Sequence, residues 1–70
     1  MQISARNQLK VKISEIKIGA VNSEILANIG DYELCAIITN DSVKNLDLKN
    51  GDEALFLVNP NDIIVLKKDK

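Results

Sequence analysis

The chain alternates apolar and polar residues with a period of two over most of its length, which predicts β-strands. The first such stretch has apolar residues at Leu9, Val11 and Ile13. Ile16 and Ile18 continue the alternation on the opposite parity. Without a change of register these isoleucines would face solvent, so we expect a β-bulge near Ser14–Glu15. A bulged, bending first strand is typical of a small closed barrel.

Two more strands and a short helix are expected next. The second strand has one face made of Val21, Ser23, Ile25, Ala27 and Ile29. Gly30–Asp31 fits a two-residue hairpin turn. The run from Tyr32 to Thr39 is apolar on both faces, which indicates a strand that is central or covered by a second subunit. Asn40–Asp41–Ser42 offers N-cap side chains, and Val43 and Leu46 follow one helical turn apart.

The last third of the chain predicts two strands separated by turns. Asn50–Gly51 is a tight turn before a strand over 54–58, and Asn59–Pro60–Asn61–Asp62 is a turn before a strand over 63–66. Five short strands with one short helix between the third and the fourth predict an all-β fold. We expect a five-stranded barrel of the oligonucleotide/oligosaccharide-binding (OB) type, as one domain spanning residues 1–70.

The small size of the chain indicates self-association. A domain of 70 residues buries only about 60% of the surface that its unfolded chain exposes. Cys35 is the only cysteine and there is no histidine, so neither an intramolecular disulfide nor a structural zinc site supplies extra stability. Oligomerisation is the remaining means of stabilisation. Within its apolar strand, Cys35 itself is expected to be a small core residue.

Composition also narrows the classes of function. The net charge is −1 and Tyr32 and Phe56 are the only aromatic residues, which argues against nucleic acid and anionic membranes as partners. No stretch has the length of a membrane span, and the N-terminus lacks the pattern of a signal peptide. We therefore expect a cytoplasmic protein. With no histidine, no nucleophile–base pair and no metal-ligand cluster, we do not expect an enzyme.

Three short segments carry residue types suited to binding an anion. Arg6 is the only arginine beside eight lysines, and its guanidinium offers two parallel donors to an oxyanion, with Ser4 close by. Thr39 and Ser42 provide hydroxyls where a strand runs into a helix. Gly19, Ala20, Val21 and Asn22 form a corner whose backbone N–H groups are suited to an anion. The alternatives are a surface arginine, a helix cap without ligand, and a plain turn.

Taken together, these segments resemble the molbindins, small molybdate-binding proteins of the Mop type in the TOBE-like domain family. The resemblance rests on 4–10 (Ser-Ala-Arg-Asn-Gln-Leu-Lys), 19–22 (Gly-Ala-Val-Asn), 36–39 (Ala-Ile-Ile-Thr) with Ser42, and 46–48 (Leu-Asp-Leu) before Gly51. It covers about Ile3 to Leu66. Each string alone is weak, and their common order makes the resemblance specific.

The resemblance implies a hexamer, arranged as a trimer of dimers, that binds molybdate or tungstate between subunits. One type of site, at the dimer interface, would combine Ser4 and Arg6 of one chain with Thr39 and Ser42 of a neighbour. A second type, near the threefold axes, would use the backbone of Gly19, Ala20, Val21 and Asn22. The implied function is storage and homeostasis of molybdate or tungstate without catalysis.

One segment departs from the family pattern. Where the family typically has a lysine followed by small or hydroxyl residues, this chain has Asn59, Pro60, Asn61 and Asp62. A cation is lost, proline lacks a backbone donor, and Asp62 brings a negative charge that opposes an anion. Two alternatives to oxyanion storage stay open. One is a molbindin-like oligomer that has lost oxyanion binding and acts as an assembly or regulatory module, and the other is a small nucleic-acid-binding barrel.

Overall fold

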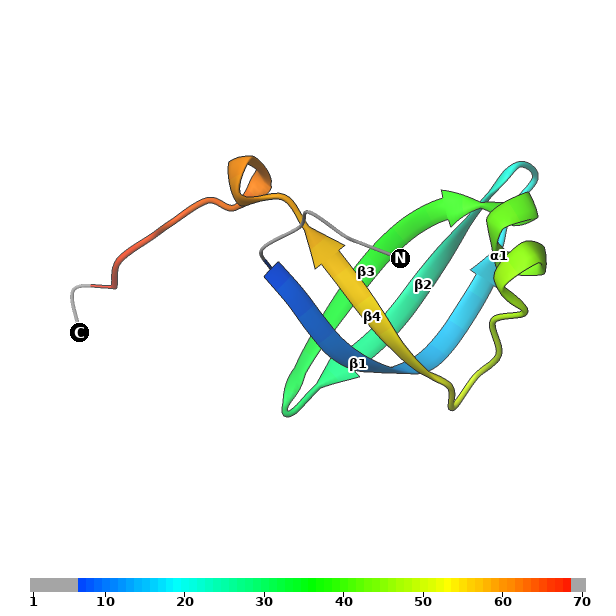
Figure 1. Cartoon of the computed structure of the whole chain (residues 1–70), viewed down its shortest axis with the longest axis horizontal. Helices are drawn as coiled ribbons and strands as arrows, with labels where there is room; N and C mark the ends of the chain where they lie inside the picture. The colour runs from blue at the N-terminus through cyan, green and yellow to red at the C-terminus, as the bar shows by residue number, and fades with distance from the viewer. Residues whose placement is uncertain (1–6, 69–70) are drawn as a thin grey trace.

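The computed structural model describes residues 7–68, which form a strongly curved antiparallel sheet with one short helix (Figure 1). In chain order the elements are β1 (Asn7–Ile18), β2 (Asn22–Ile29), β3 (Tyr32–Thr39), α1 (Asn40–Leu46), β4 (Glu53–Val58) and the 3-10 turn η1 (Pro60–Asp62). The strands are ordered β3-β2-β1-β4, and each neighbouring pair is antiparallel. The all-β prediction, with a single short helix after the third strand, is confirmed.

A bulge in the middle of β1 lets this one strand serve two partners. Its first half pairs with β4, from Asn7 opposite Val58 onward, and its second half pairs with β2. The register with β2 shifts between Ile13 and Glu15, as the change of parity predicted. The extra residue bends the strand, and Ile16 is thereby half-buried.

The core lies on the inner face of β1 and β2. Its buried members are Val11, Ile13, Ser23, Ile25 and Ala27. Four of the five residues expected on one face of β2 therefore lie inward, counting Ile29, which is half-buried. Val21 does not: its side chain is 70% exposed, because the chain at this point is still turning the corner before β2 begins.

The helix α1 begins one residue earlier than its side chains indicated. Thr39 is the N-cap, and its side chain accepts a hydrogen bond from the backbone N–H of Ser42. The helix ends at Leu46, and the C-cap residue Asp47 has a left-handed backbone conformation with φ 51°. It has seven residues, and no helix within 7–68 is long and apolar enough to cross a membrane.

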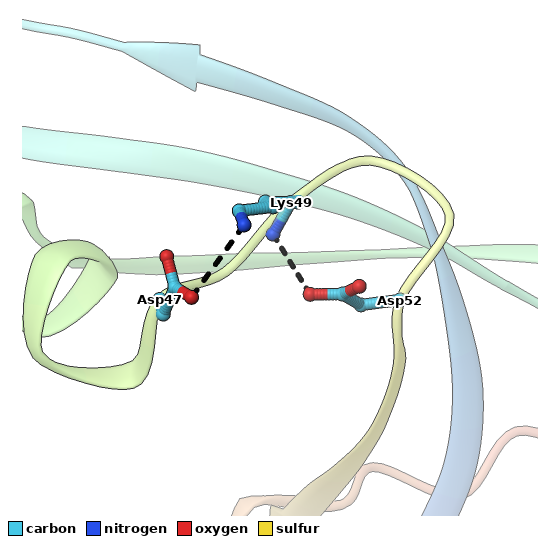
Figure 2. A network of polar contacts seen from close by, with 3 residues as sticks. All are labelled: Asp47, Lys49 and Asp52. Atoms are coloured by element: carbon cyan, nitrogen blue, oxygen red, sulfur yellow. Dashed lines mark hydrogen bonds and ion pairs between the residues drawn. The ribbon is translucent and has the colours of Figure 1, made fainter.

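The loop from α1 to β4 is fastened to β1 at the bulge. Figure 2 shows Lys49 held between Asp47 Oδ2, 3.6 Å from its Nζ, and Asp52 Oδ2, which accepts from its backbone N–H at 3.0 Å. The N–H of Gly51 donates to the Ile13 carbonyl at 2.7 Å. The loop therefore fixes where β4 begins to pair with β1.

The fifth strand and the closed barrel are not confirmed, because the sheet is open at β3 and β4. After η1 the chain runs away from the sheet as an extended segment (Figure 1). Ile64, Val65 and Leu66 are 93%, 89% and 88% exposed. The apolar pattern of this segment is that of a strand, but within the described residues it has no strand beside it. We call residues 63–66 the C-terminal arm.

The prediction for Cys35 was wrong, because its thiol is exposed rather than in the core. Alternation along β3 turns Leu34, Ala36 and Ile38 inward, where they are half-buried, and leaves Cys35 on the outer face. Desolvation, followed by the nearby Glu24 carboxylate, raises the pKa of the thiol above its ordinary value. A thiol with a raised pKa is a poor nucleophile at neutral pH.

Candidate functional site

The hydroxyls of Thr39 and Ser42 meet at the junction of β3 and α1. Their oxygens are 2.8 Å apart, and Thr39 Oγ1 also accepts from the Ser42 N–H at 3.1 Å. When the Ser42 hydroxyl donates to Thr39, the hydroxyl proton of Thr39 is free to point outward. Thr39 therefore caps the helix, and its hydroxyl proton is left as one donor for a ligand. Asp41, in the first turn of α1, is an unfavourable charge for an anion here.

The corner between β1 and β2 exposes backbone donors. Its closing hydrogen bond runs from the Gly19 N–H to the Asn22 carbonyl at 3.0 Å. The N–H groups of Ala20 and Val21 donate to no described residue, and both residues are exposed. A Cβ on Gly19 would lie 2.6 Å from the Asn22 carbonyl oxygen, so a larger residue would open the corner.

The electrostatics of the corner are close to neutral. A shallow hollow beside Gly19 and Asn22 includes Lys17 and Glu24, which face each other across β1 and β2. Their charges offset one another at this spot. Any anion bound at the corner would therefore depend mainly on backbone N–H groups, as in other anion-binding turns.

The structure brings two of the three candidate segments together. Asn22 and Thr39 are cross-strand partners on β2 and β3, so the corner and the Thr39–Ser42 pair lie side by side. Asn40 joins them: its backbone N–H donates to the Val21 carbonyl at 2.8 Å, and its Nδ2 donates to the Gly19 carbonyl at 2.9 Å. Sequence reasoning gave Asn40 only a capping role, because this contact depends on how three strands align.

The third segment precedes β1, whose first residue lies at the opposite end of the sheet. Ser4 and Arg6 lie outside the described residues, but Asn7, which follows Arg6, starts β1 opposite Val58. Thr39 lies beyond the far end of β1, where Ile18 pairs with Ser23 and Ser23 with Ile38. The twelve residues of β1 span roughly 36 Å along the strand at about 3.3 Å per step.

The departing segment 59–62 follows the end of β4 that pairs with the start of β1. Val58, the last residue of β4, lies opposite Asn7, the first residue of β1. Asn59 makes no side-chain capping bond to η1, and Pro60 opens its first turn. Asn59, Asn61 and Asp62 are all exposed. The described residues contain no cluster of three or more His, Cys, Asp or Glu side chains suited to a metal ion.

Comparison with known proteins identifies the family. The model of the TOBE domain matches residues 3–65. The chain belongs to the TOBE domain family. Among curated proteins, molybdenum-pterin-binding protein 2 of Clostridium pasteurianum is 42% identical over 67 residues, which cover 94% of this chain and 98% of that protein. The resemblance to the small Mop-type members is thus confirmed.

Solved structures of similar proteins have the same fold. A molybdate-binding protein from Sporomusa ovata matches with a TM-score of 0.92 and 43% identity, over 96% of this chain and 100% of that chain. The cytoplasmic molybdate-binding protein ModG, with molybdate bound, matches with a TM-score of 0.79 and 40% identity, over 84% of this chain and 43% of that one. Both of these proteins are described as molybdate-binding proteins.

Proposed function

We propose that this TOBE protein binds molybdate or tungstate at sites shared between subunits and stores the oxyanion in the cytoplasm without catalysing a reaction. Three of the similar proteins support the ligand, since their names specify molybdenum-pterin or molybdate binding. The cytoplasmic ModG supports the compartment. The proposed first site uses Ser4 and Arg6 of one chain with Thr39 and Ser42 of another, and the second uses the corner 19–22.

The observation that carries the proposal is the separation of the two halves of the first site. Asn7, next to Arg6, and Thr39 belong to opposite ends of one curved sheet (Figure 1). A single chain therefore offers the guanidinium and the hydroxyls to different places. Two chains that approach end to end would bring one chain's Arg6 to the other's Thr39. This favours an inter-subunit site over one within a single barrel.

The donor types suit a tetrahedral dianion. A guanidinium donates two parallel charge-assisted hydrogen bonds to oxyanions, and hydroxyl and backbone N–H groups add neutral donors. A desolvated dianion needs several such donors, because an unpaired buried charge is costly. A chain of this size supplies few at any one point. Several chains together would supply enough donors at one site.

The open sheet supports an oligomer in which chains complete one another. The free edge strands β3 and β4 border an apolar cavity, lined among others by Ile38, Leu46, Leu48, Phe56 and Val58. A fifth strand between these edges would fill the cavity and close the barrel. The chain's own arm runs elsewhere (Figure 1), so we propose that the arm of a second copy closes each barrel. A hexamer built from such dimers is the assembly that we propose.

Calorimetric titration of the purified protein with molybdate, tungstate and sulfate tests the function. We expect heat of binding with molybdate or tungstate and little with sulfate. Arg6→Ala should weaken one class of sites by about 1.5–3 kcal/mol, because charge-assisted hydrogen bonds are lost, and Arg6→Lys should restore only part of it. No binding by the native protein would refute the function. Unchanged affinity in Arg6→Ala would refute the role of Arg6.

A second candidate is an oligomer that no longer binds oxyanions and serves in assembly or regulation. The specific observation in its favour is the register of β4, because Val58 lies opposite Asn7 and is followed directly by 59–62, which carries a negative charge at Asp62 and no cation. The same titration separates the two candidates. Intact oligomers that give no heat with any of the three anions would favour this second function.

A further inference from the structure

Asn40 makes three hydrogen bonds to the strands behind it. Its backbone N–H donates to the Val21 carbonyl, its Nδ2 donates to the Gly19 carbonyl, and its Oδ1 accepts from the Ser23 hydroxyl. The backbone N–H of a first helical residue has no acceptor within its own helix. Here that group and the Nδ2 end of the side-chain amide bind the corner, while the Oδ1 end binds Ser23 at the start of β2. The corner is thus fastened from its two sides, at Gly19 and at Val21.

Ser23 fixes the direction of the Asn40 amide. It is the one buried polar residue within 7–68, at 1% exposure, and a buried hydroxyl without a partner costs free energy. Its donation to Oδ1 settles which end of the amide accepts, so Nδ2 is turned toward Gly19. The orientation of the Asn40 side chain is therefore set by the core of the sheet and not by solvent.

Asn40 also directly follows Thr39. Asn40 is therefore hydrogen-bonded to the corner at Gly19 and Val21. It is also joined by a peptide bond to Thr39, the N-cap, whose hydroxyl contacts Ser42. A shift of Gly19 or Val21 on ligand binding would be passed to Thr39 through two short hydrogen bonds. Such a contiguous set of contacts is a physical basis for coupling between neighbouring sites.

We propose that Asn40 is a positioning residue that joins the corner 19–22 and the Thr39–Ser42 pair into one unit, so that each site responds to oxyanion at the other. The inference rests on the proposed function. Asn40 Nδ2 holds the Gly19 carbonyl inward, which turns the N–H of Ala20, in the same trans peptide unit, outward for a ligand. Donors fixed before binding lower the entropic cost of binding.

The experiment compares two variants that differ only at Asn40. Ser23→Ala removes the buried hydroxyl and keeps the bond from Nδ2 to Gly19. Ser23→Ala with Asn40→Ala removes that bond as well, without leaving an unpaired hydroxyl in the core. Both are made with Arg6→Ala, so that binding at the corner is measured alone. Asn45→Ala, an exposed position on the same helix, is the matched surface control.

Molybdate is titrated by calorimetry, and amide NMR spectra of Ala20, Val21, Thr39 and Ser42 are recorded at a temperature where thermal unfolding shows every variant folded. We expect molybdate affinity about fivefold to tenfold lower without Asn40, the loss of about one hydrogen bond. Molybdate should shift the Thr39 and Ser42 amides in Ser23→Ala, and these shifts should be smaller once Asn40 is replaced, because only the backbone bond to Val21 then remains. A residue that served stability alone would change the unfolding temperature and neither of these signals.

Unchanged affinity, or amide shifts at Thr39 and Ser42 of undiminished size without the Asn40 side chain, would overturn the proposal while the proposed function stands. A native protein that binds no molybdate would remove the function, and this inference with it. The Asn45→Ala control must match the native chain in both measurements. If it also loses affinity, the effect belongs to the helix as a whole and not to Asn40, which overturns the assignment.

Discussion

At the scale of single residues, Thr39 serves the fold and the proposed site with one oxygen. Its Oγ1 accepts from the Ser42 N–H, which stabilises the start of α1, and accepting leaves its own proton available to an anion. The two tasks do not compete, since a hydroxyl has one donor and two acceptor positions. Thr39 is therefore a structural residue that can also bind an anion in the proposed site.

Two substitutions of Thr39 distinguish the role of its hydroxyl from that of its methyl group. Thr39→Val should destabilise the protein by about 0.5–2 kcal/mol, because the cap is lost, and should also weaken molybdate binding. Thr39→Ser keeps the hydroxyl and should retain both. Thermal unfolding and calorimetry measure the two effects. If Thr39→Val lowered stability but bound molybdate like the native chain, Thr39 would be a cap alone.

At the scale of elements, local and non-local features differ in how far the sequence determines them. The bulge in β1 follows from a change of parity between Ile13 and Ile16, which any strand with one buried face must accommodate. The partner of the C-terminal arm is different. Its apolar residues indicate a strand, but which sheet it joins depends on contacts that no local pattern encodes. The contact of Asn40 with Gly19 is non-local in the same way.

The loop before β4 offers a test of backbone conformation. Gly51 has φ +92°, follows Asn50 in a turn closed from the Asp52 N–H to the Lys49 carbonyl, and has open space where a Cβ would stand. Gly51→Ala should therefore cost about 1–2 kcal/mol from the backbone alone. That corresponds to a fall in Tm of roughly 4–16 °C.

The neighbouring residue provides the control for Gly51. Asn50→Ala removes an exposed side chain and should change Tm very little. Gly51→Asn should lose less than Gly51→Ala, because asparagine tolerates a positive φ better than alanine does. Equal stability of Gly51→Ala and the native chain would mean that the turn has another conformation in solution.

At the scale of the whole molecule, the lone chain is incomplete in two matching ways. It has an apolar cavity between free sheet edges and an apolar arm that covers nothing in its own fold. The arm of one copy would cover the cavity of a second copy. The first proposed site has the same character, since β1, which follows Arg6 in the chain, starts at the end of the sheet opposite Thr39. Assembly and ligand binding would then both depend on contacts between two copies of the chain.

Charged substitutions in the arm test this assembly. Ile64 and Val65 are 93% and 89% exposed, so Ile64→Asp and Val65→Asp should be harmless if the arm stays free. Neighbouring residues of a strand face opposite sides, so one of the two would be buried when the arm joins a second sheet. We expect that one to break the oligomer, because an unpaired buried charge is costly.

Sedimentation velocity at micromolar concentration reads out the result. The control is Lys68→Asp, which lies beyond the arm and should leave the oligomer intact. A native protein that sediments as a folded monomer, or an oligomer that tolerates both arm substitutions, would contradict the exchange of arms. A chain ending at Asp62 should likewise lose the oligomer and become less stable, because the cavity is left uncovered.

The last prediction concerns charge at the junction between subunits. Asn59 and Asp62 are exposed and follow Val58, the residue opposite Asn7 at the start of β1, so Asn59→Lys with Asp62→Ser changes charge without breaking a packed contact. Each change is worth on the order of 1 kcal/mol toward an anion near Arg6. Together they should tighten molybdate binding at this site at least tenfold, and the gain should shrink as salt is added.

The matched control for the double variant has the same change of net charge at a distance. Asn28→Lys with Asp31→Ser, at the hairpin between β2 and β3, leaves the turn 59–62 as it is. Calorimetry at two salt concentrations compares both with the native protein. Equal tightening in the two variants would assign the effect to net charge. No gain in either affinity or stoichiometry for the 59–62 variant would mean that this turn lies away from the ligand, and that the departure of Asn59 and Asp62 from the family pattern is neutral.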